Sequence, residues 1–177
     1  KPFVCTETGW FSNLQGDDGH EIQSRYVVQA FVRSMTTNMD VVSWFTLADN
    51  NNDDRKWGLL DVNLNPKPSY YAHQTMNAQM SGSGYVRTLD PEETGSEQIE
   101  AYEFAIPKEG TIVVAWSNDL VTVTHELELQ APQVTVVDMF GDEITVYDGD
   151  DGVMDGCVHI SIGVNPVYLR RDGGVRK

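Results

Sequence analysis

The hydrophobic pattern of this sequence changes at a short stretch of alternating serine and glycine, Ser81-Gly82-Ser83-Gly84. Before this stretch, short apolar runs alternate with helix-like apolar stripes, and after it apolar residues recur at every second position. Alternating strands and helices indicate βαβ units, whereas a period of two is typical of half-buried strands. Serine and glycine together are typical of linkers. The sequence therefore predicts an α+β protein with two domains, residues 1–82 and 83–177.

The first domain opens on a strand that leads to a carboxylate. The apolar run Phe3 to Cys5 is short and precedes Glu7, and Gly9 signals a turn. We expect a buried strand that holds Glu7 at its carboxyl end, where the catalytic residues of α/β barrels lie. Asp18 and Glu21 have the spacing of a capping box, which predicts a helix that ends at 36–38. Its expected buried stripe is Ile22, Tyr26, Val27, Ala30, Phe31 and Met35.

A second strand and a second helix complete the first domain. Residues 40–47 are apolar at both even and odd positions, as in a parallel strand covered on both faces. The polar segment 48–56 then predicts a loop at the same end of the sheet as Glu7. Pro68 suits the first turn of a helix predicted over residues 69–80. The order is strand, helix, strand, helix.

The second domain is predicted to be an antiparallel β-sandwich of about seven or eight strands, because short alternating runs are separated by turn residues. The clearest runs are 112–116, 121–129, 134–137, 143–147, 158–162 and 167–169.

The charge of the chain excludes several classes of partner. The formal net charge is −15, and residues 83–177, with eighteen acidic and six basic residues, carry −12 of it. Such a field repels nucleic acids and anionic lipids, and the apolar runs are too short to cross a bilayer. We therefore expect neither a nucleic acid nor a membrane as partner.

No cofactor or metal site is predicted. Cys5 and Cys157 lie in different domains without CxxC spacing, so neither a zinc site nor a disulfide framework is implied. The stretch Asp148 to Asp155 is similar to a calcium loop in composition, but it lacks the EF-hand order and the terminal Glu. Calcium there stays an open alternative.

Several motifs together resemble the C-terminal part of a retaining TIM-barrel glycoside hydrolase, namely the last two βα units of the barrel and the β-sandwich that follows it. They are Thr6-Glu7-Thr8-Gly9-Trp10, Ser43-Trp44-Phe45, Gly58-Leu59-Leu60-Asp61, Pro66-Lys67-Pro68-Ser69-Tyr70-Tyr71-Ala72, Val136 to Gly141 and Asn165 to Leu169.

The resemblance implies a carbohydrate substrate and a role for each matching residue. It makes Glu7 the catalytic nucleophile, and it makes Trp44 the indole that stacks under the reacting sugar. Both roles fit the chemistry, since a carboxylate can attack an anomeric carbon and an indole face suits the C–H side of a pyranose. Trp10, Asp49 and Asn50 would contact neighbouring sugars. The resemblance also favours a secreted or periplasmic protein.

The sequence departs from the family pattern in one decisive respect. A retaining mechanism needs a second carboxyl, which the family supplies as a Glu preceded by Asn near barrel strand 4, and no Asn-Glu pair occurs in this sequence. Only two of eight barrel strands are expected here. We therefore expect part of a longer protein, inactive by itself and prone to self-association through the uncovered strand edges of residues 1–80.

Two other functions stay open beside a glycosidase. The chain could be a carbohydrate-binding module with Trp116 and the tyrosines Tyr85, Tyr102 and Tyr147 on its binding face. It could also be a structural β-sandwich without a ligand. The sugar, its linkage and endo or exo action are not decided by the sequence.

Overall fold

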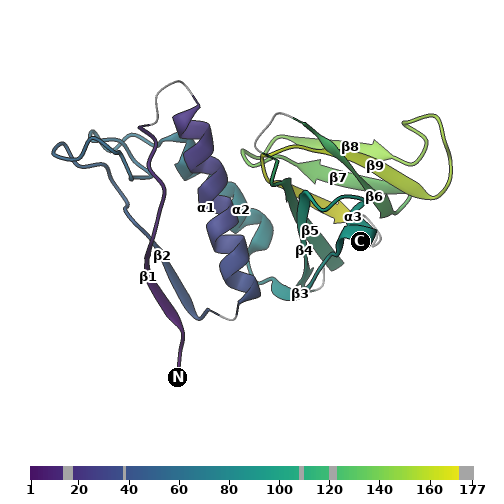
Figure 1. Cartoon of the computed structure of the whole chain (residues 1–177), viewed down its shortest axis with the longest axis horizontal. Coiled ribbons are helices and arrows are strands. Elements are labelled where there is room, and N and C mark those ends of the chain that lie inside the picture. Colours follow the sequence, from purple (N-terminus) through teal and green to yellow (C-terminus); the bar gives the residue numbers. More distant parts are fainter. Residues whose placement is uncertain (14–17, 38, 108–109, 120–122, 172–177) are drawn as a thin grey trace. The chain divides into compact units, whose positions relative to one another are not determined.

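A computed structural model describes residues 1–13, 18–37, 39–107, 110–119 and 123–171 of the chain. These residues form two compact units, Lys1–Gln79 and Met80–Lys177 (Figure 1). The division falls beside the Ser81–Gly84 stretch. We call them unit 1 and unit 2. The chain is a mixed α+β protein with small sheets and few helices.

Unit 1 follows the predicted order of strand, helix, strand, helix. Its elements are β1 (Val4–Thr8), α1 (Gly19–Thr36), β2 (Val41–Trp44) and α2 (Pro68–Met80), of which the last residue belongs to unit 2. β1 and β2 pair in parallel, with Val4 opposite Val41 and Cys5 opposite Val42. A parallel pair joined through a helix is a βαβ unit, which confirms that prediction.

The expectation of a buried first strand is wrong. Phe3 is 71% exposed, Val4 50% and Val41 49%. Among the described residues, β1 and β2 form a sheet of two strands. Each strand therefore has one partner, and Phe3, Val4 and Val41 lie exposed at the start of the pair.

The helix α1 begins at the predicted residue, but its N-terminal capping and its buried face differ from the expectation. Asp18 has helical backbone angles and no side-chain capping bond, so the capping box is not formed. Its carbonyl accepts the Ile22 N–H instead. The buried face is centred on Val28 and Val32, while Met35 of the predicted stripe is exposed. The buried face of α1 is therefore rotated by about one residue from the expected stripe.

A hydrogen bond and a ring contact lie between α1 and α2. The Ser69 hydroxyl donates to Gln23 Oε1 over 3.0 Å, and this pair is fully buried. The Phe31 and His73 rings lie 5.1 Å apart between centroids. Burial lowers the pKa of His73, because the charged imidazolium is disfavoured away from water.

Unit 2 contains eight strands and one short helix among its described residues. They are β3 (Gly84–Thr88), α3 (Pro91–Thr94), β4 (Ile99–Ile106), β5 (Gly110–Ser117), β6 (His125–Gln130), β7 (Gln133–Val137), β8 (Glu143–Tyr147), β9 (Cys157–Ile162) and β10 (Val167–Arg171).

The strands of unit 2 form two antiparallel sheets around one apolar core. The larger sheet has the order β3-β4-β5-β10-β7-β8, and β6 pairs with β9 in the smaller one. Buried residues of both sheets, such as Leu127 and Ile160 from the small sheet and Val113 and Leu169 from the large one, belong to the same cluster. The alternating pattern thus predicted the pairing type correctly, although the strand β4 and the helix α3 were not anticipated.

None of the described helices has the length and apolar character needed to cross a membrane.

Candidate functional site

Glu7 lies near the carboxyl end of β1 and is exposed to solvent. The pairing of β1 with β2 shifts register between Cys5 and Thr8, so β1 contains an irregular stretch that includes Glu7. Irregularities of this kind re-aim side chains and are common beside active sites. The strand end therefore presents Glu7 as an accessible carboxylate.

Trp44 ends β2 at the same edge of the sheet. It pairs with Thr8, the residue that follows Glu7, so Glu7 and Trp44 lie at the same end of the parallel strand pair. The Trp44 Nε1–H donates to the Trp57 carbonyl over 3.2 Å. The indole is half-buried, and this bond fixes its orientation.

Aromatic side chains surround this edge of unit 1. Trp10 stacks on Tyr26, with ring centroids 4.1 Å apart, and Phe11 lies edge-on to Trp57 at 5.3 Å. Phe45 also meets Trp57 edge-on, at 6.1 Å. Trp10 therefore has one ring face occupied by Tyr26.

Asp49 lies in a buried ion pair. Its Oδ2 is 3.2 Å from Lys67 Nζ, and each side chain is only 5% exposed. Asp49 Oδ1 also accepts the Gly58 N–H. Burial lowers the pKa of Lys67, and the hydrogen bond that Lys67 donates to the Asp49 carboxylate opposes this effect. These contacts leave the expected sugar contact of Asp49 without support.

Asn50 is exposed and shapes the loop after β2. Its side-chain Oδ1 accepts the Asn52 N–H over 2.9 Å, and its carbonyl accepts Lys56 Nζ over 3.1 Å. The contact of Asn50 with a ligand stays a prediction.

Sequence reasoning gave no role to Gln23, Trp57 or Lys67, which the structure places in this region. Two glycines beside this region, Gly9 and Gly58, are the sequence feature that could have indicated its close packing. A Cβ on Gly9 would lie 2.4 Å from the Phe45 carbonyl oxygen, and one on Gly58 would lie 2.3 Å from the Asp49 nitrogen. Glycine is therefore required at both positions for close approach of neighbouring backbone.

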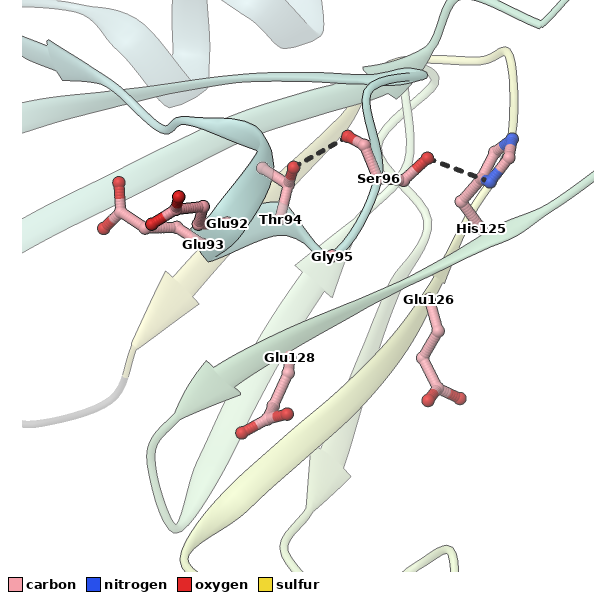
Figure 2. A pocket seen from close by; sticks show the side chains of 8 residues that line it. All are labelled: Glu92, Glu93, Thr94, Gly95, Ser96, His125, Glu126 and Glu128. Carbon is pink, nitrogen blue, oxygen red and sulfur yellow. Dashed lines mark hydrogen bonds between the residues drawn. The ribbon is translucent and has the colours of Figure 1, made fainter.

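A concavity lies in unit 2, away from Glu7 in the sequence and unlike its surroundings in composition. Figure 2 shows its lining, which comes from α3, the turn after it and β6: Glu92, Glu93, Thr94, Gly95, Ser96, His125, Glu126 and Glu128. Ser96 Oγ lies 3.2 Å from His125 Nδ1. With four glutamates and no Trp, Tyr or Phe, this lining offers a sugar no stacking surface, so we do not assign the candidate site here.

The described residues of unit 2 do not form the binding face expected of a carbohydrate-binding module. Trp116 is 0% exposed because β5 is a central strand, so the expectation that Trp116 contacts sugars is wrong. The exposed Tyr85 and Tyr147 lie on β3 and β8, the two opposite edges of the large sheet. At about 4.8 Å between strands, edges five strands apart cannot form one aromatic row.

No group of three or more His, Cys, Asp and Glu side chains among the described residues is arranged to hold a metal ion. In the stretch expected to be similar to a calcium loop, carboxylates accept backbone N–H groups. Asp148 accepts those of Asp155 and Gly156, and Asp151 accepts that of Val153.

The solved structures that resemble this chain include three glycoside hydrolases. One is a family 39 glycoside hydrolase from the gut symbiont Bacteroides cellulosilyticus WH2, with a TM-score of 0.74, 23% identity, and coverage of 96% of this chain and 34% of that protein. The catalytic domain of the GH30 xylanase C from Talaromyces cellulolyticus gives 0.60 and 14%, covering 95% of this chain and 40% of that one. The GH51 arabinofuranosidase from Xanthomonas axonopodis pv. citri gives 0.58 and 10%, with 96% and 41% covered.

At these identities the likeness concerns the fold. This chain spans between 34% and 41% of the length of those three proteins. No protein-family model matches the sequence. No curated protein matches it either.

Proposed function

We propose that this chain is the C-terminal part of a retaining glycoside hydrolase that acts on a β-linked poly- or oligosaccharide. In this proposal residues 1–82 are the last two βα units of a (β/α)8 barrel, and residues 83–177 are a β-sandwich accessory domain. The parallel βαβ unit, the two antiparallel sheets and the likeness to three glycoside hydrolases support it.

The observation that carries the proposal is the position of Glu7 beside the Thr8–Trp44 pair. A nucleophilic carboxylate needs a fixed backbone, access to the ligand and a surface that holds the sugar ring. The strand position and exposure of Glu7 support the first two, and the half-buried indole of Trp44, whose N–H binds the Trp57 carbonyl, supports the third.

The proposed mechanism has two steps. The Glu7 carboxylate attacks the anomeric carbon and forms a glycosyl-enzyme, while a second carboxylic acid protonates the departing oxygen. That second group then accepts a proton from water, which attacks the anomeric carbon and releases Glu7. It must lie roughly 5–5.5 Å from Glu7. We assign it to a part of the parent protein that precedes these residues, so the chain by itself should be inactive.

Trapping the covalent intermediate tests this proposal. The reading frame upstream of the Lys1 codon would be cloned and the extended enzyme treated with a 2-deoxy-2-fluoro-β-glycoside. A fluoroxyloside is the first choice, since one of the similar structures is a xylanase. We expect mass spectrometry to find the label on the Glu7 peptide. Glu21→Gln, which alters an exposed carboxylate on α1, should label normally, and Glu7→Gln should not. A label on another carboxylate, or an inverted product, would contradict the proposal.

The two alternatives give different results with the 177-residue chain. A carbohydrate-binding module would be retained on insoluble glycans and weakened by Tyr85→Ala or Tyr147→Ala. A structural module would neither bind nor hydrolyse, and its extended form would also resist labelling.

A further inference from the structure

The backbone carbonyl of Lys56 accepts hydrogen bonds from four donors in unit 1. They are the Ser12 N–H at 3.1 Å, the Ser12 hydroxyl at 3.1 Å, Gln23 Nε2 at 3.2 Å and Lys67 Nζ at 3.2 Å. A carbonyl oxygen has two lone pairs, so these bonds are shared and each is long. We call the four donors and this carbonyl the Lys56 hub.

The donors of the hub come from three separate places in unit 1. Ser12 follows β1, Gln23 lies in the first turns of α1, and Lys67 immediately precedes α2. All three residues are buried, and Gln23 is 0% exposed. The hub therefore fixes one point of the loop after β2 against the rest of the unit.

Lys56 has a positive φ of 58°, a backbone conformation that is uncommon outside glycine. Such a conformation persists where the surroundings over-determine it, and it is frequent at functional sites. Here the surroundings are the four donors of the hub. The next residue is Trp57, whose carbonyl accepts the Trp44 indole N–H.

We infer that Gln23 and Lys67 are positioning residues, which act through the Lys56 hub and the Trp57 carbonyl to hold the indole of Trp44 in the orientation that receives the sugar. Gln23 serves a second part of the same edge, because its Nε2 also donates to the Trp10 carbonyl over 2.8 Å. Lys67 adds its ion pair with Asp49, whose Oδ1 binds the N–H of Gly58 on the other side of Trp57. Trp57 is thus held from both neighbours.

The inference rests on the proposed function in one respect, that Trp44 is the surface on which the sugar stacks. The positioning itself can be measured without a sugar. A negative result would leave the labelling of Glu7 untouched, and a failure to label Glu7 would leave the positioning intact.

The test is the indole N–H signal of Trp44 in the 15N spectrum of the whole chain, which has four tryptophans. Trp44→Phe assigns the signal. In Gln23→Met and Lys67→Met we expect the Trp44 proton to move upfield and to exchange faster with water, because its acceptor is no longer held. Ser12→Ala removes one of the four donors and should give a smaller change in the same direction.

The matched control is Val28→Ala, which leaves a cavity on the same helix as Gln23 but alters no polar group. It should leave the Trp44 signal in place. An unchanged signal in folded Gln23→Met or Ser12→Ala, or an equal change in Val28→Ala, would overturn the inference. If Lys67→Met does not fold, the other two variants still decide it.

Discussion

Lys67 and Asp49 form an ion pair that is almost completely removed from solvent, with Nζ and Oδ2 3.2 Å apart. Asp49 also binds the Gly58 N–H, and Lys67 also binds the Lys56 carbonyl. The pair therefore closes the loop after β2 onto the start of α2. Where water is excluded, removal of one partner leaves the other charge buried and uncompensated, which is strongly destabilising.

Removing one partner of this pair should be more harmful than changing both. We expect Lys67→Met to lower the free energy of unfolding of unit 1 by about 3–5 kcal/mol, because it leaves the Asp49 charge buried and unpaired. Adding Asp49→Asn should restore part of the loss, since an amide keeps an acceptor for Gly58. Urea unfolding followed at the helical circular-dichroism band reports unit 1, which holds α1 and most of α2. A double variant as unstable as the single one would contradict this account.

Glu7→Gln should abolish turnover in the extended enzyme without unfolding it. Removal of a covalent nucleophile from catalytic groups that act together typically lowers kcat by about 10⁴–10⁶-fold. Because Glu7 is exposed, its stability effect should be small. Steady-state kinetics and thermal unfolding would be measured side by side. An active Glu7→Gln enzyme would exclude Glu7 as the nucleophile, whereas Glu21→Gln should retain full activity.

The order of elements could be predicted from the sequence, because strand and helix periods differ clearly on the two sides of Ser81–Gly84. The capping of the individual helices could not be predicted. Asp18 and Glu21 have the spacing of a capping box that is not formed, whereas Asp90 and Glu93, where none was expected, form a complete one. Pro91, at the first helical position, has a fixed φ that suits the start of a helix and so favours the capping box of Asp90 and Glu93.

The placement of the candidate site residues could be anticipated where it depends on strand order, but not where it depends on tertiary contacts. Parallel pairing alone brings Glu7 and Trp44 to one edge. The burial of Asp49 could not be anticipated, because its partner Lys67 is eighteen residues away across a loop. A polar loop residue and a buried ion-pair partner look the same in sequence until the second residue is known.

Unit 2 should lose stability as the pH rises through the range in which His159 titrates. His159 Nδ1 lies 3.0 Å from Glu126 Oε1, and Nε2 lies near Asp151 and Asp155. The hydrogen bond to Glu126, with these carboxylates, raises the pKa of His159 above its usual 6.5. The stabilisation is therefore complete below about pH 6.5 and disappears as the pH passes the raised pKa.

The measurement for this prediction is the difference in unfolding midpoint between the natural chain and His159→Gln at several pH values. The difference removes the general effect of the high negative charge, which both proteins share. We expect it to be large at pH 5.5 and to shrink towards pH 8.5. A difference that does not vary with pH would show that His159 is not linked to the stability of unit 2.

The exposed apolar residues at the start of β1 and β2, together with the unpaired strand edges, should drive self-association when the chain is isolated. About half or more of the surface of Phe3, Val4 and Val41 is exposed. Each strand also has an unpaired edge among the described residues. Val41→Lys should weaken association, because a charge at a strand edge opposes pairing with another chain. Light scattering over a concentration series measures this. Ile144→Ser, on β8 of unit 2, is the control that should change nothing, and a monodisperse natural chain at high concentration would refute the prediction.

The complete burial of Trp116 has a practical consequence for following how unit 2 unfolds. Trp10, Trp44 and Trp57 belong to unit 1, so Trp116 is the single tryptophan of unit 2. An indole enclosed on a central strand fluoresces at short wavelength and is shielded from soluble quenchers until its surroundings open. Trp116 is therefore a natural optical reporter of unit 2, and the point at which soluble quenchers reach it marks the opening of that unit.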